Sequence, residues 1–298
     1  MGGTLQNLVQ DRLSPGGIWQ LMEPTRSVLR HQISLLPKRS VSEIDARYPV
    51  TPASMRAFLE DFFTRHYFQI QNSLVSYTTS PDFLDLASSG HLRILDIGAG
   101  PAIAALAIMD LVGCLLECVQ TRGGWPTSRV IDVTYVLNDT SAICLAVAQR
   151  MLAGHFHRRR GYGTVVVRSR MFSVQTPFPS NMHQIGRIAR NVGTYDITIL
   201  SYVVGPLVED SGLSTLVNGL LSIEKLCTHN GRILIVQDRF RGALMRRISR
   251  AVGISTHREE LTQEVYPDRD VGEIRTYWYY DCLYGPRDET ATHQGLVA

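Results

Sequence analysis

The stretch Leu92-Arg93-Ile94-Leu95-Asp96-Ile97-Gly98-Ala99-Gly100-Pro101-Ala102 decides the fold of this 298-residue chain. Its first half is an apolar run with little room for a polar face, which predicts a strand buried on both sides. Gly98 and Gly100 allow a sharp turn and bring backbone amides close to a ligand. Pro101 suits the first position of a helix, so we expect a helix from Pro101 to Leu116. A strand, a glycine turn and a helix N-terminus together form the kind of cradle that holds a nucleotide.

The spacing of the glycines narrows the choice of nucleotide. A dinucleotide fingerprint needs a third glycine where this chain has Ile103, and a P-loop needs a lysine that is absent near this turn. What remains is Asp96 at the strand end followed by Gly-x-Gly. This arrangement resembles motif I of the class I S-adenosylmethionine (SAM) methyltransferases, D-x-G-x-G-P-G, in which Pro101 also matches. Ala102 stands where that family has its last glycine. The alternative is an ordinary strand, turn and helix of some other α/β fold.

The rest of the chain alternates between strand-like and helix-like segments. After the first strand, further strands are expected at 131–137, 164–168, 195–200, 232–237 and 275–284, and helices at 141–152, 207–227 and 241–252. This succession resembles the methyltransferase domain, whose sheet ends in an antiparallel strand. The resemblance implies an α/β fold with a seven-stranded, mostly parallel Rossmann-like sheet and an N-terminal helical cap. The expected division is an arm and cap over 1–88, a SAM-binding domain over 89–287 and a tail over 288–298.

Polar residues follow several of these strands, and open α/β sheets bind ligands at the carboxyl ends of their strands. Asp139 follows the second strand, where a carboxylate can accept both hydroxyls of a ribose or can cap the next helix. Ser201 and Tyr202 follow the fourth strand, so we expect them to face the reacting methyl group. After the third strand the family often has an acidic residue that receives the adenine amine. This chain has none there. Met171 or Phe172 is expected to pack on the adenine ring instead, and Ser169 is expected to accept the amine.

These residues make up the expected site. Through the resemblance, the cofactor SAM is expected to bind at Asp96, Gly98, Ala99, Gly100, Asp139, Met171 and Ser201. Tyr202 is the candidate for orienting an acceptor or relaying a proton, and His66 is the candidate base if the cap closes over the site. No metal site is expected. The five cysteines contain no C-x-x-C pair and suit small buried apolar positions in a reducing compartment.

The first 88 residues are expected to be helical. Glycine pairs and prolines in residues 1–40 indicate loosely held helices or a partly disordered arm. From an N-cap at Thr51, apolar residues at helical spacing predict a helix to about His66 and a second helix from Phe68 to Tyr77. Two interpretations are open for this part. It is either a helical cap packed beside the sheet or a lid over cofactor and acceptor.

A narrower resemblance rests on three segments. Arg47–Ala53, Gly98–Pro101 and Ser201–Gly205 are similar to the methyltransferase-like ribosome small-subunit assembly family. That family is associated with iron–sulfur-binding cysteines, and this chain has no comparable cysteine set. Ala102 and the missing acid after the third strand favour a non-catalytic role of this kind, in ribosome assembly or scaffolding.

The charge of the chain leaves the acceptor open. A net charge of +3 does not require a nucleic-acid partner. The chain is nevertheless rich in arginine, because only Lys38 and Lys225 of its 30 basic residues are lysine, which leaves 28 arginines. The basic clusters His155–Arg160 and Arg241–Val252 fit either a solvated helix surface or a contact with RNA. We therefore expect a small-molecule acceptor, slightly ahead of RNA, and no membrane partner, with a homodimer left open. No secretory signal is recognisable, so a cytoplasmic location is expected, with a mitochondrial one left open.

Overall fold

The computed structural model describes residues 4–38, 48–49, 51–123, 129–158, 161–162, 165–265 and 274–286. Its centre is one sheet of eight strands in the order β3-β4-β2-β1-β5-β6-β8-β7. The strands are β1 (His91–Ile97), β2 (Arg129–Asn138), β3 (Gly161–Tyr162), β4 (Val165–Val174), β5 (Tyr195–Ser201), β6 (Cys227–Asp238), β7 (His257–Glu264) and β8 (Ile274–Tyr284). The tail from residue 288 and parts of the basic cluster at 155–160 lie outside the described residues.

The five central strands, from β4 to β6, run parallel, and β8 pairs antiparallel with both β6 and β7. The expected seven-stranded, mostly parallel sheet is therefore confirmed. The two-residue β3 is an antiparallel addition at the edge beside β4. The chain begins the sheet at β1 and later returns to its other side with β5, so β1 and β5 form the topological switch point of the sheet.

Both faces of the central strands are buried, as their apolar sequences predict. Ile94 of β1 packs into one hydrophobic cluster, whereas its neighbour Leu95 packs into a second cluster on the opposite face. The same alternation separates Leu234 from Ile235 on β6. Successive side chains of a strand point to opposite faces, so continuous apolar runs require a helix layer on each side.

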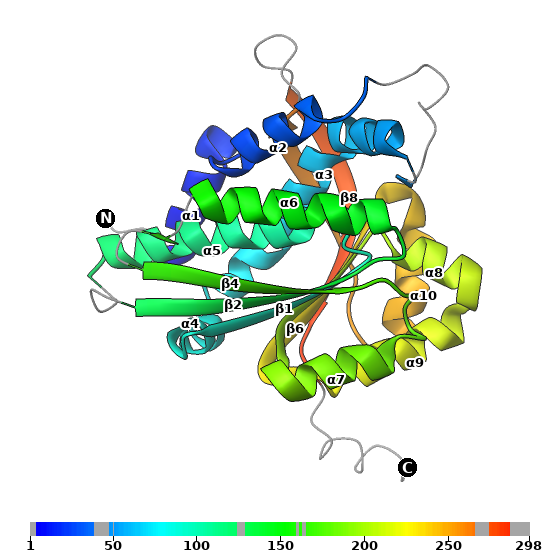
Figure 1. Ribbon diagram of the computed structural model, residues 1–298. Helices are drawn as coiled ribbons and strands as arrows, with labels where there is room; N and C mark the ends of the chain where they lie inside the picture. Colours follow the sequence, from blue (N-terminus) through cyan, green and yellow to red (C-terminus); the bar gives the residue numbers. More distant parts are fainter. Residues whose placement is uncertain are drawn as a thin grey trace.

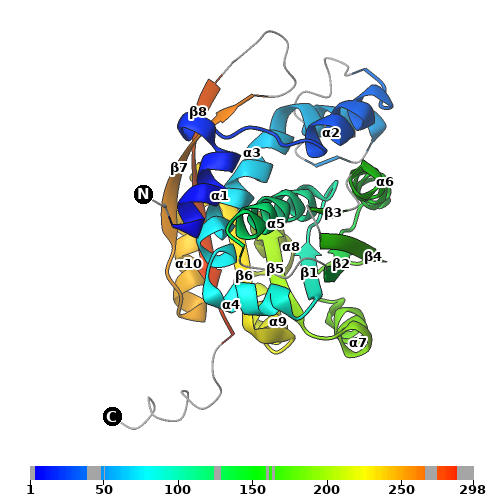
Figure 2. The ribbon, with the colours of Figure 1, turned by 90° about the vertical axis from the view of Figure 1, so that its left-hand side faces the viewer.

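Helices form these two layers (Figure 1, Figure 2). The first layer contains α1 (Leu5–Leu13), α2 (Thr25–Ser34), α3 (Pro52–Thr78), α5 (Ile103–Thr121) and α6 (Ala142–Arg158), with α4 (Pro81–Ser88) leading into β1. The second layer contains α7 (Met182–Val192), α9 (Leu213–Glu224) and α10 (Gly242–Val252), and α8 (Val204–Ser211) directly follows the end of β5. Two short 3-10 turns, η1 (Pro15–Gly17) and η3 (Arg239–Arg241), complete the described elements.

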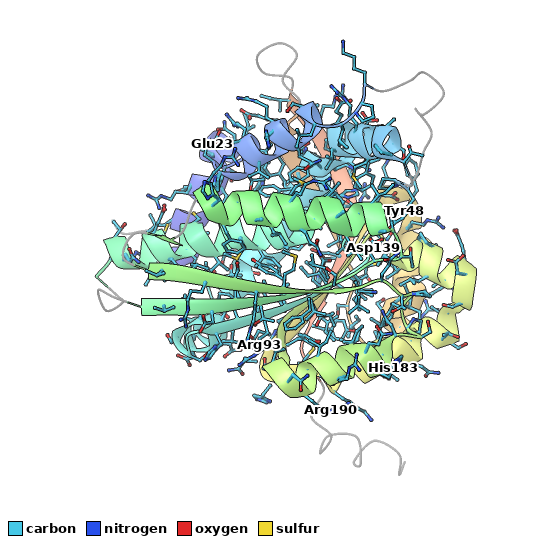
Figure 3. The ribbon with its side chains drawn as sticks, in the orientation of Figure 1. Glu23, Tyr48, Arg93, Asp139, His183 and Arg190 are labelled. Carbon is cyan, nitrogen blue, oxygen red and sulfur yellow. The ribbon has the colours of Figure 1, made fainter. Side chains whose placement is uncertain are left out.

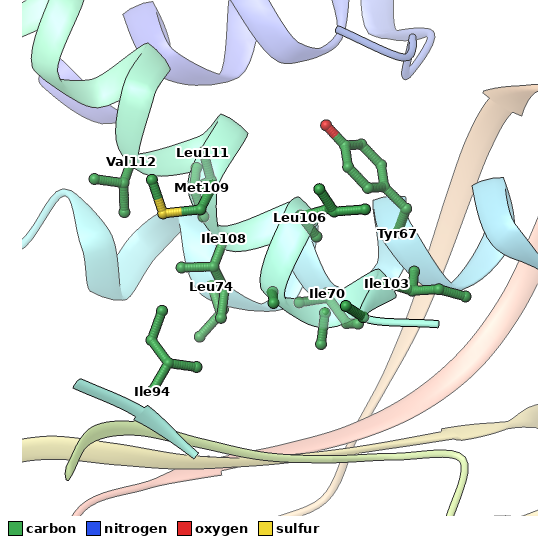
Figure 4. Packing of buried hydrophobic residues seen from close by; sticks show 14 of the residues in the cluster. Tyr67, Ile70, Leu74, Ile94, Ile103, Leu106, Ile108, Met109, Leu111 and Val112 are labelled. Atoms are coloured by element: carbon green, nitrogen blue, oxygen red, sulfur yellow. The ribbon is translucent and has the colours of Figure 1, made fainter. Parts of the chain in front are cut away.

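The N-terminal segment is part of the first layer. The two helices expected from Thr51 to Tyr77 are one helix, α3, which a capping box between Thr51 and Ser54 begins. Figure 4 shows Tyr67 and Leu74 of α3 within the same apolar cluster as β1 and α5. The helix also contacts β7 and β8, so it covers the antiparallel end of the sheet. The helix thus packs beside the sheet, as expected for a cap, and its residues Phe62, Arg65 and His66 also reach the cavity described below, as expected for a lid.

Several expected boundaries were wrong for identifiable reasons. The expected helix 207–227 is two helices, because Gly212 adopts a positive φ of 82° between α8 and α9. The helix expected from Pro101 begins at Ile103, since Ala102 before it is left-handed, with φ 62°. The strand expected to end at Arg168 continues to Val174. The strand β7 and helix α7 were not expected; β7 is largely polar and buries only part of one face.

The helix α5 passes, by length and composition, as a candidate membrane span, with a mean hydropathy of 1.9 over its most apolar window. However, 89% of the residues in that window are buried inside the protein. Its apolar character is explained by its place between the sheet and the helices α1 and α3. All five cysteines are free, and among the described residues no three metal-binding side chains gather into a candidate metal site.

Candidate functional site

The turn after β1 adopts the conformation that its glycines permit. Gly98 has φ +69°, and a Cβ on it would lie only 2.6 Å from the Cγ2 atom of Val203. Gly100 has φ +52°, and a Cβ there would meet nothing within 4 Å. The first glycine is therefore required by packing as well as by conformation, whereas the second borders open space. That open space belongs to the cavity described below.

The amides of this turn bind the end of the neighbouring strand. The Ala99 N–H donates to the carbonyl of Asn138 at 2.9 Å, and the Gly100 N–H donates to Oδ2 of Asp139 at 2.8 Å. The sequence predicted that these amides would approach a ligand directly. Instead they fix Asp139, the candidate ribose acceptor, against the glycine turn.

Asp139 is almost fully occupied by donors from the chain itself. Its Oδ1 accepts the Ser141 N–H at 2.8 Å and also the hydroxyl of Tyr48. Ser141 Oγ in turn accepts the Cys144 N–H at the start of α6. Burial raises the pKa of Asp139, and the Tyr48, Ser141 and Gly100 hydrogen bonds oppose that shift. A carboxylate offers about four acceptor positions. Both hydroxyls of a ribose can therefore bind Asp139 only if the Tyr48 hydroxyl gives up its acceptor position on Oδ1.

Asp96, at the end of β1, differs from Asp139 in its hydrogen bonding. It is buried, and neither of its carboxyl oxygens has a hydrogen-bond partner among the described residues. Burial, together with the charge of Asp139, raises its pKa to about 8. A buried carboxyl without a donor is costly, so native structures retain one chiefly where a ligand or ion satisfies it. The orphaned carboxyl marks the floor of a binding site.

A cavity of about 870 Å³ opens over these residues at the carboxyl ends of the parallel strands. Its size is within the range of small-molecule and cofactor sites. Its lining falls into two parts. Asp96, the glycine turn and Asp139 form one end, and Phe58, Phe62, His66, Tyr202 and Phe240 contribute rings to the other. Figure 3 labels Tyr48 and Asp139, which lie close together at the carboxyl end of the sheet.

His66 of α3 and Tyr202 after β5 meet in this cavity, although 136 positions separate them in sequence. Their rings stack with centroids 3.5 Å apart at an interplanar angle of 12°. Nε2 of His66, the hydroxyl of Tyr202 and Oγ of Ser201 are buried with no hydrogen-bond partner among the described residues. Tyr202 also has φ 63°, which is uncommon for a residue other than glycine and typical of functional sites.

Burial controls the protonation of this pair. It lowers the pKa of His66 well below its usual value, and the Arg65 guanidinium lowers it further, so His66 is neutral near pH 7. Burial also raises the pKa of Tyr202, which stays protonated. A neutral imidazole in the Nδ1–H tautomer can accept a proton at Nε2, and the tyrosine hydroxyl can donate a hydrogen bond.

Arg65 supplies a positive charge next to the pair. Its guanidinium lies over the rings of Phe62 and Tyr277, at 5.0 and 5.6 Å from their centroids. Its buried Nε has no acceptor among the described residues. The aromatic end of the cavity can therefore hold a planar group and offer it one cation.

Most of the residues predicted from sequence meet in this cavity. Its lining includes Asp96, Gly98, Ala99, Gly100, Asp139, Ser201, Tyr202 and His66. Met171 does not belong to it. Met171 lies in the interior of β4 opposite Tyr135, because the strand runs six residues beyond its expected end at Arg168. Pro177 and Phe178, which follow the true end of β4, line the cavity in its place.

Several lining residues were not predicted from the sequence. Tyr48 lies in the segment Arg47–Ala53 of the narrower family resemblance, and Arg65 directly precedes His66, but neither carries a signal of its own. Gln237, whose buried Nε2 has no partner within the described part of the chain, ends the apolar run of β6. The run Thr176-Pro177-Phe178-Pro179 was the available signal for the end of β4, since prolines cannot continue a central strand.

The cavity thus lies at the switch point between β1 and β5, in a parallel sheet that ends with an antiparallel strand inserted between β6 and β7. The chain has the class I methyltransferase fold. No protein-family model matches the chain, and no curated protein matches its sequence. The expected link to ribosome-assembly proteins therefore stays a prediction.

Solved structures of this fold are similar to the chain at a distance. One is precorrin-8w decarboxylase from Methanobacterium thermoautotrophicum, 14% identical, covering 65% of this chain and 82% of its own, with a TM-score of 0.38. Another is the N-methyltransferase NodS from Bradyrhizobium japonicum, 12% identical, covering 76% and 97%, with a TM-score of 0.38. A third is precorrin-6y C5,15-methyltransferase from Geobacter metallireducens, 10% identical, covering 70% and 88%, with a TM-score of 0.38. Likeness this distant says nothing about an acceptor.

Proposed function

We propose that this protein is a SAM-dependent methyltransferase that transfers a methyl group to an oxygen or nitrogen atom of a small-molecule acceptor. The observation that carries the proposal is the orphaned carboxyl of Asp96, buried beside Asp139 in a cavity of about 870 Å³ at the switch point. A ligand that brings a cation to Asp96 and a diol to Asp139 would satisfy both groups. SAM has an α-ammonium group, a ribose and, when bound, an electrophilic methyl group on its sulfonium.

The residues present fit this cofactor. Asp96 can accept the ammonium group, which would favour the ionised form of a carboxyl whose pKa is about 8 in its absence. Gly100 leaves space above the turn, and Asp139 can accept ribose hydroxyls once Tyr48 yields its position. Pro177 and Phe178 provide apolar surface beyond Asp139.

The aromatic end of the cavity is suited to the acceptor. Neutral His66 can take a proton from an acceptor hydroxyl or amine, and Tyr202 can fix that atom by a hydrogen bond. The rings of Phe58 and Phe62 favour a planar, partly apolar molecule, and they exclude water from the transfer. The confined volume between α3 and the strand ends favours a small molecule over a polymer.

One observation favours a second candidate, a non-catalytic methyltransferase-like protein. The Tyr48 hydroxyl already occupies the carboxylate that would bind ribose. If that contact cannot be displaced, the cavity would bind no nucleoside and the fold would serve as a scaffold.

Methyl transfer from SAM to a panel of small phenols, enols and amines tests the proposal, with released S-adenosylhomocysteine as the readout. We expect His66→Gln and Tyr202→Phe to lower turnover, by about 100-fold for the base, while the affinity for S-adenosylhomocysteine changes little. Turnover that survives both substitutions would contradict the placement of the acceptor. A wild-type chain that binds no cofactor would favour the scaffold.

A further inference from the structure

The second helix layer has an outer surface with an unusual distribution of charge. The helices α7, α9 and α10 pack on one face of the sheet, with α9 in contact with both neighbours (Figure 1, Figure 2). The exposed basic residues of α7 and α10 are His183, Arg187, Arg190, Arg246, Arg247 and Arg250. Figure 3 places His183 and Arg190 on α7 at the outer side of this layer. We call the outer surface of the three helices the basic layer.

The basic layer exposes no carboxylate. Glu224 is the one acidic residue in the three helices, and it is only 8% exposed. None of the five arginines forms an ion pair among the described residues. Two arginines of the opposite layer do, Arg12 with Glu117 at 3.0 Å and Arg26 with Glu264 at 3.6 Å. Five exposed arginines without an ion pair among the described residues therefore share one surface of a chain whose net charge is only +3.

Between the two cationic rows runs a neutral strip. The exposed residues of α9 are Ser214, Thr215, Asn218 and Ser222. Hydroxyl and amide groups can both donate and accept hydrogen bonds. The helix α9 contacts both α7 and α10, so the strip lies between the two rows.

This pattern matches one class of polyanion. Rows of unpaired arginine suit two phosphate backbones. No Phe, Tyr or Trp occurs in the three helices, so His183 is their one side chain with a ring on which an unpaired base could stack. A-form RNA presents a wide, shallow minor groove in which 2′-hydroxyls lie between two phosphate strands. We propose that the basic layer binds double-stranded RNA, with α7 and α10 on the two backbones and α9 on the 2′-hydroxyls.

The layer and the cavity are separate. No residue of α7, α9 or α10 lines the cavity, which opens at the strand ends, and Glu209 on α8 pairs with Arg241 at 2.8 Å. RNA binding therefore stands independently of the proposed methyl transfer. S-adenosylhomocysteine binding, measured on the same variants, should be unchanged.

The test is the binding of an RNA duplex of about 20 base pairs over a series of salt concentrations. We expect Arg190→Gln/Arg247→Gln to weaken binding at least tenfold and to lower the slope of log K against log salt by about 2. The matched control, Arg12→Gln/Arg26→Gln, removes the same charge from the opposite layer and should retain wild-type affinity and slope. Equal losses in the two variants would overturn the proposal, because binding would then follow net charge alone.

A second arm tests the choice of RNA. We expect wild-type protein to bind the RNA duplex more tightly than a DNA duplex of the same sequence. Asn218→Ala/Ser222→Ala should reduce that preference, since it removes polar groups of the strip while keeping every arginine. Equal binding of both duplexes, or binding of anionic phospholipid vesicles in place of RNA, would overturn the assignment.

Discussion

The buried carboxyl of Asp96 lowers the stability of the free protein, and the same carboxyl is the group that we expect to bind the cofactor. Its carboxyl is buried without a donor, and its pKa of about 8 keeps it protonated in the free protein at neutral pH. In the unfolded chain it ionises near the ordinary value of 3.8. The folded state therefore holds an extra proton between about pH 4 and pH 8, and this residue makes stability fall as pH rises through that window.

Asp96→Asn should remove this pH dependence. The amide resembles the protonated acid but cannot ionise, so the variant should be more stable than wild type at pH 8, by several kcal/mol at most, and similar to it near pH 4. It should also bind SAM more weakly, because the carboxylate that meets the ammonium group is gone. Urea unfolding at pH 5 and pH 8 measures the first effect. Parallel pH profiles for the two proteins would show that Asp96 is ionised in the fold.

Tyr48 competes with the cofactor in this account. Tyr48→Phe frees one acceptor position of Asp139 for a ribose hydroxyl, so we expect S-adenosylhomocysteine to bind roughly fivefold to tenfold more tightly. Tyr77→Phe is the matched control, since the Tyr77 hydroxyl donates to the carbonyl of Asn230 and does not line the cavity. Weaker binding by Tyr48→Phe would mean that the hydroxyl contacts the cofactor itself.

The two glycines of the turn should differ when each is replaced by alanine. Gly98→Ala brings a Cβ within 2.6 Å of Val203 and should destabilise the fold markedly. The Cβ of Gly100→Ala meets no atom within 4 Å, so this variant should lose only about 1–2 kcal/mol of stability, the penalty of a left-handed backbone at a residue with a Cβ. It should also obstruct the cofactor. Thermal unfolding of both variants measures the stability that each one loses. A larger loss of stability in Gly100→Ala than in Gly98→Ala would contradict the prediction.

At the scale of elements, a buried polar cluster joins the N-terminal helices to the core. Asp110 of α5 accepts hydrogen bonds from Thr25 of α2 and, at 2.6 Å, from Tyr67 of α3, and it meets Nε2 of His155 of α6 at 2.9 Å. Asp110 and His155 are fully buried. The cluster joins four helices, which explains why α2 and α3 form one layer of the fold with α5 and α6.

Asp110→Ala should therefore unfold the protein far more easily than the loss of an exposed acid. Removing one partner of a buried pair costs about 3–5 kcal/mol. Asp82→Ala, which breaks a half-exposed contact with Arg232 at 3.3 Å, should cost at most about 1 kcal/mol. Urea midpoints of the two variants measure the difference. Similar midpoints would show that the cluster does not hold the layer.

Sequence alone predicted the elements that are buried on both faces and missed those that depend on neighbours. The strand β1 and its turn were predicted because apolar runs and glycines carry their own signal. The strand β7 was missed since its residues are mostly polar and only pairing with β8 makes it a strand. The extent of β4 was misjudged because exposed arginines and serines interrupt its apolar pattern, and this error displaced Met171. Asp96 and Asp139 were predicted, but the Tyr48 hydrogen bond joins residues 91 positions apart and leaves no local signal.

At the scale of the whole molecule, the fold separates two surfaces. The cavity lies at the carboxyl ends of the strands, where His66 from the first layer meets Tyr202 from the sheet. The basic layer lies over one face of the same sheet and contributes nothing to the cavity. We therefore expect the proposed cofactor and the proposed RNA duplex to bind at the same time.

The measurement that tests the central claim most directly is calorimetric titration of the purified protein with S-adenosylhomocysteine. We predict binding to the wild-type chain with a micromolar dissociation constant, and loss of that binding in a folded Asp139→Ala variant. Binding would establish the cavity as a cofactor site. A folded wild-type chain that gives no heat of binding would contradict the account and leave the fold as a scaffold.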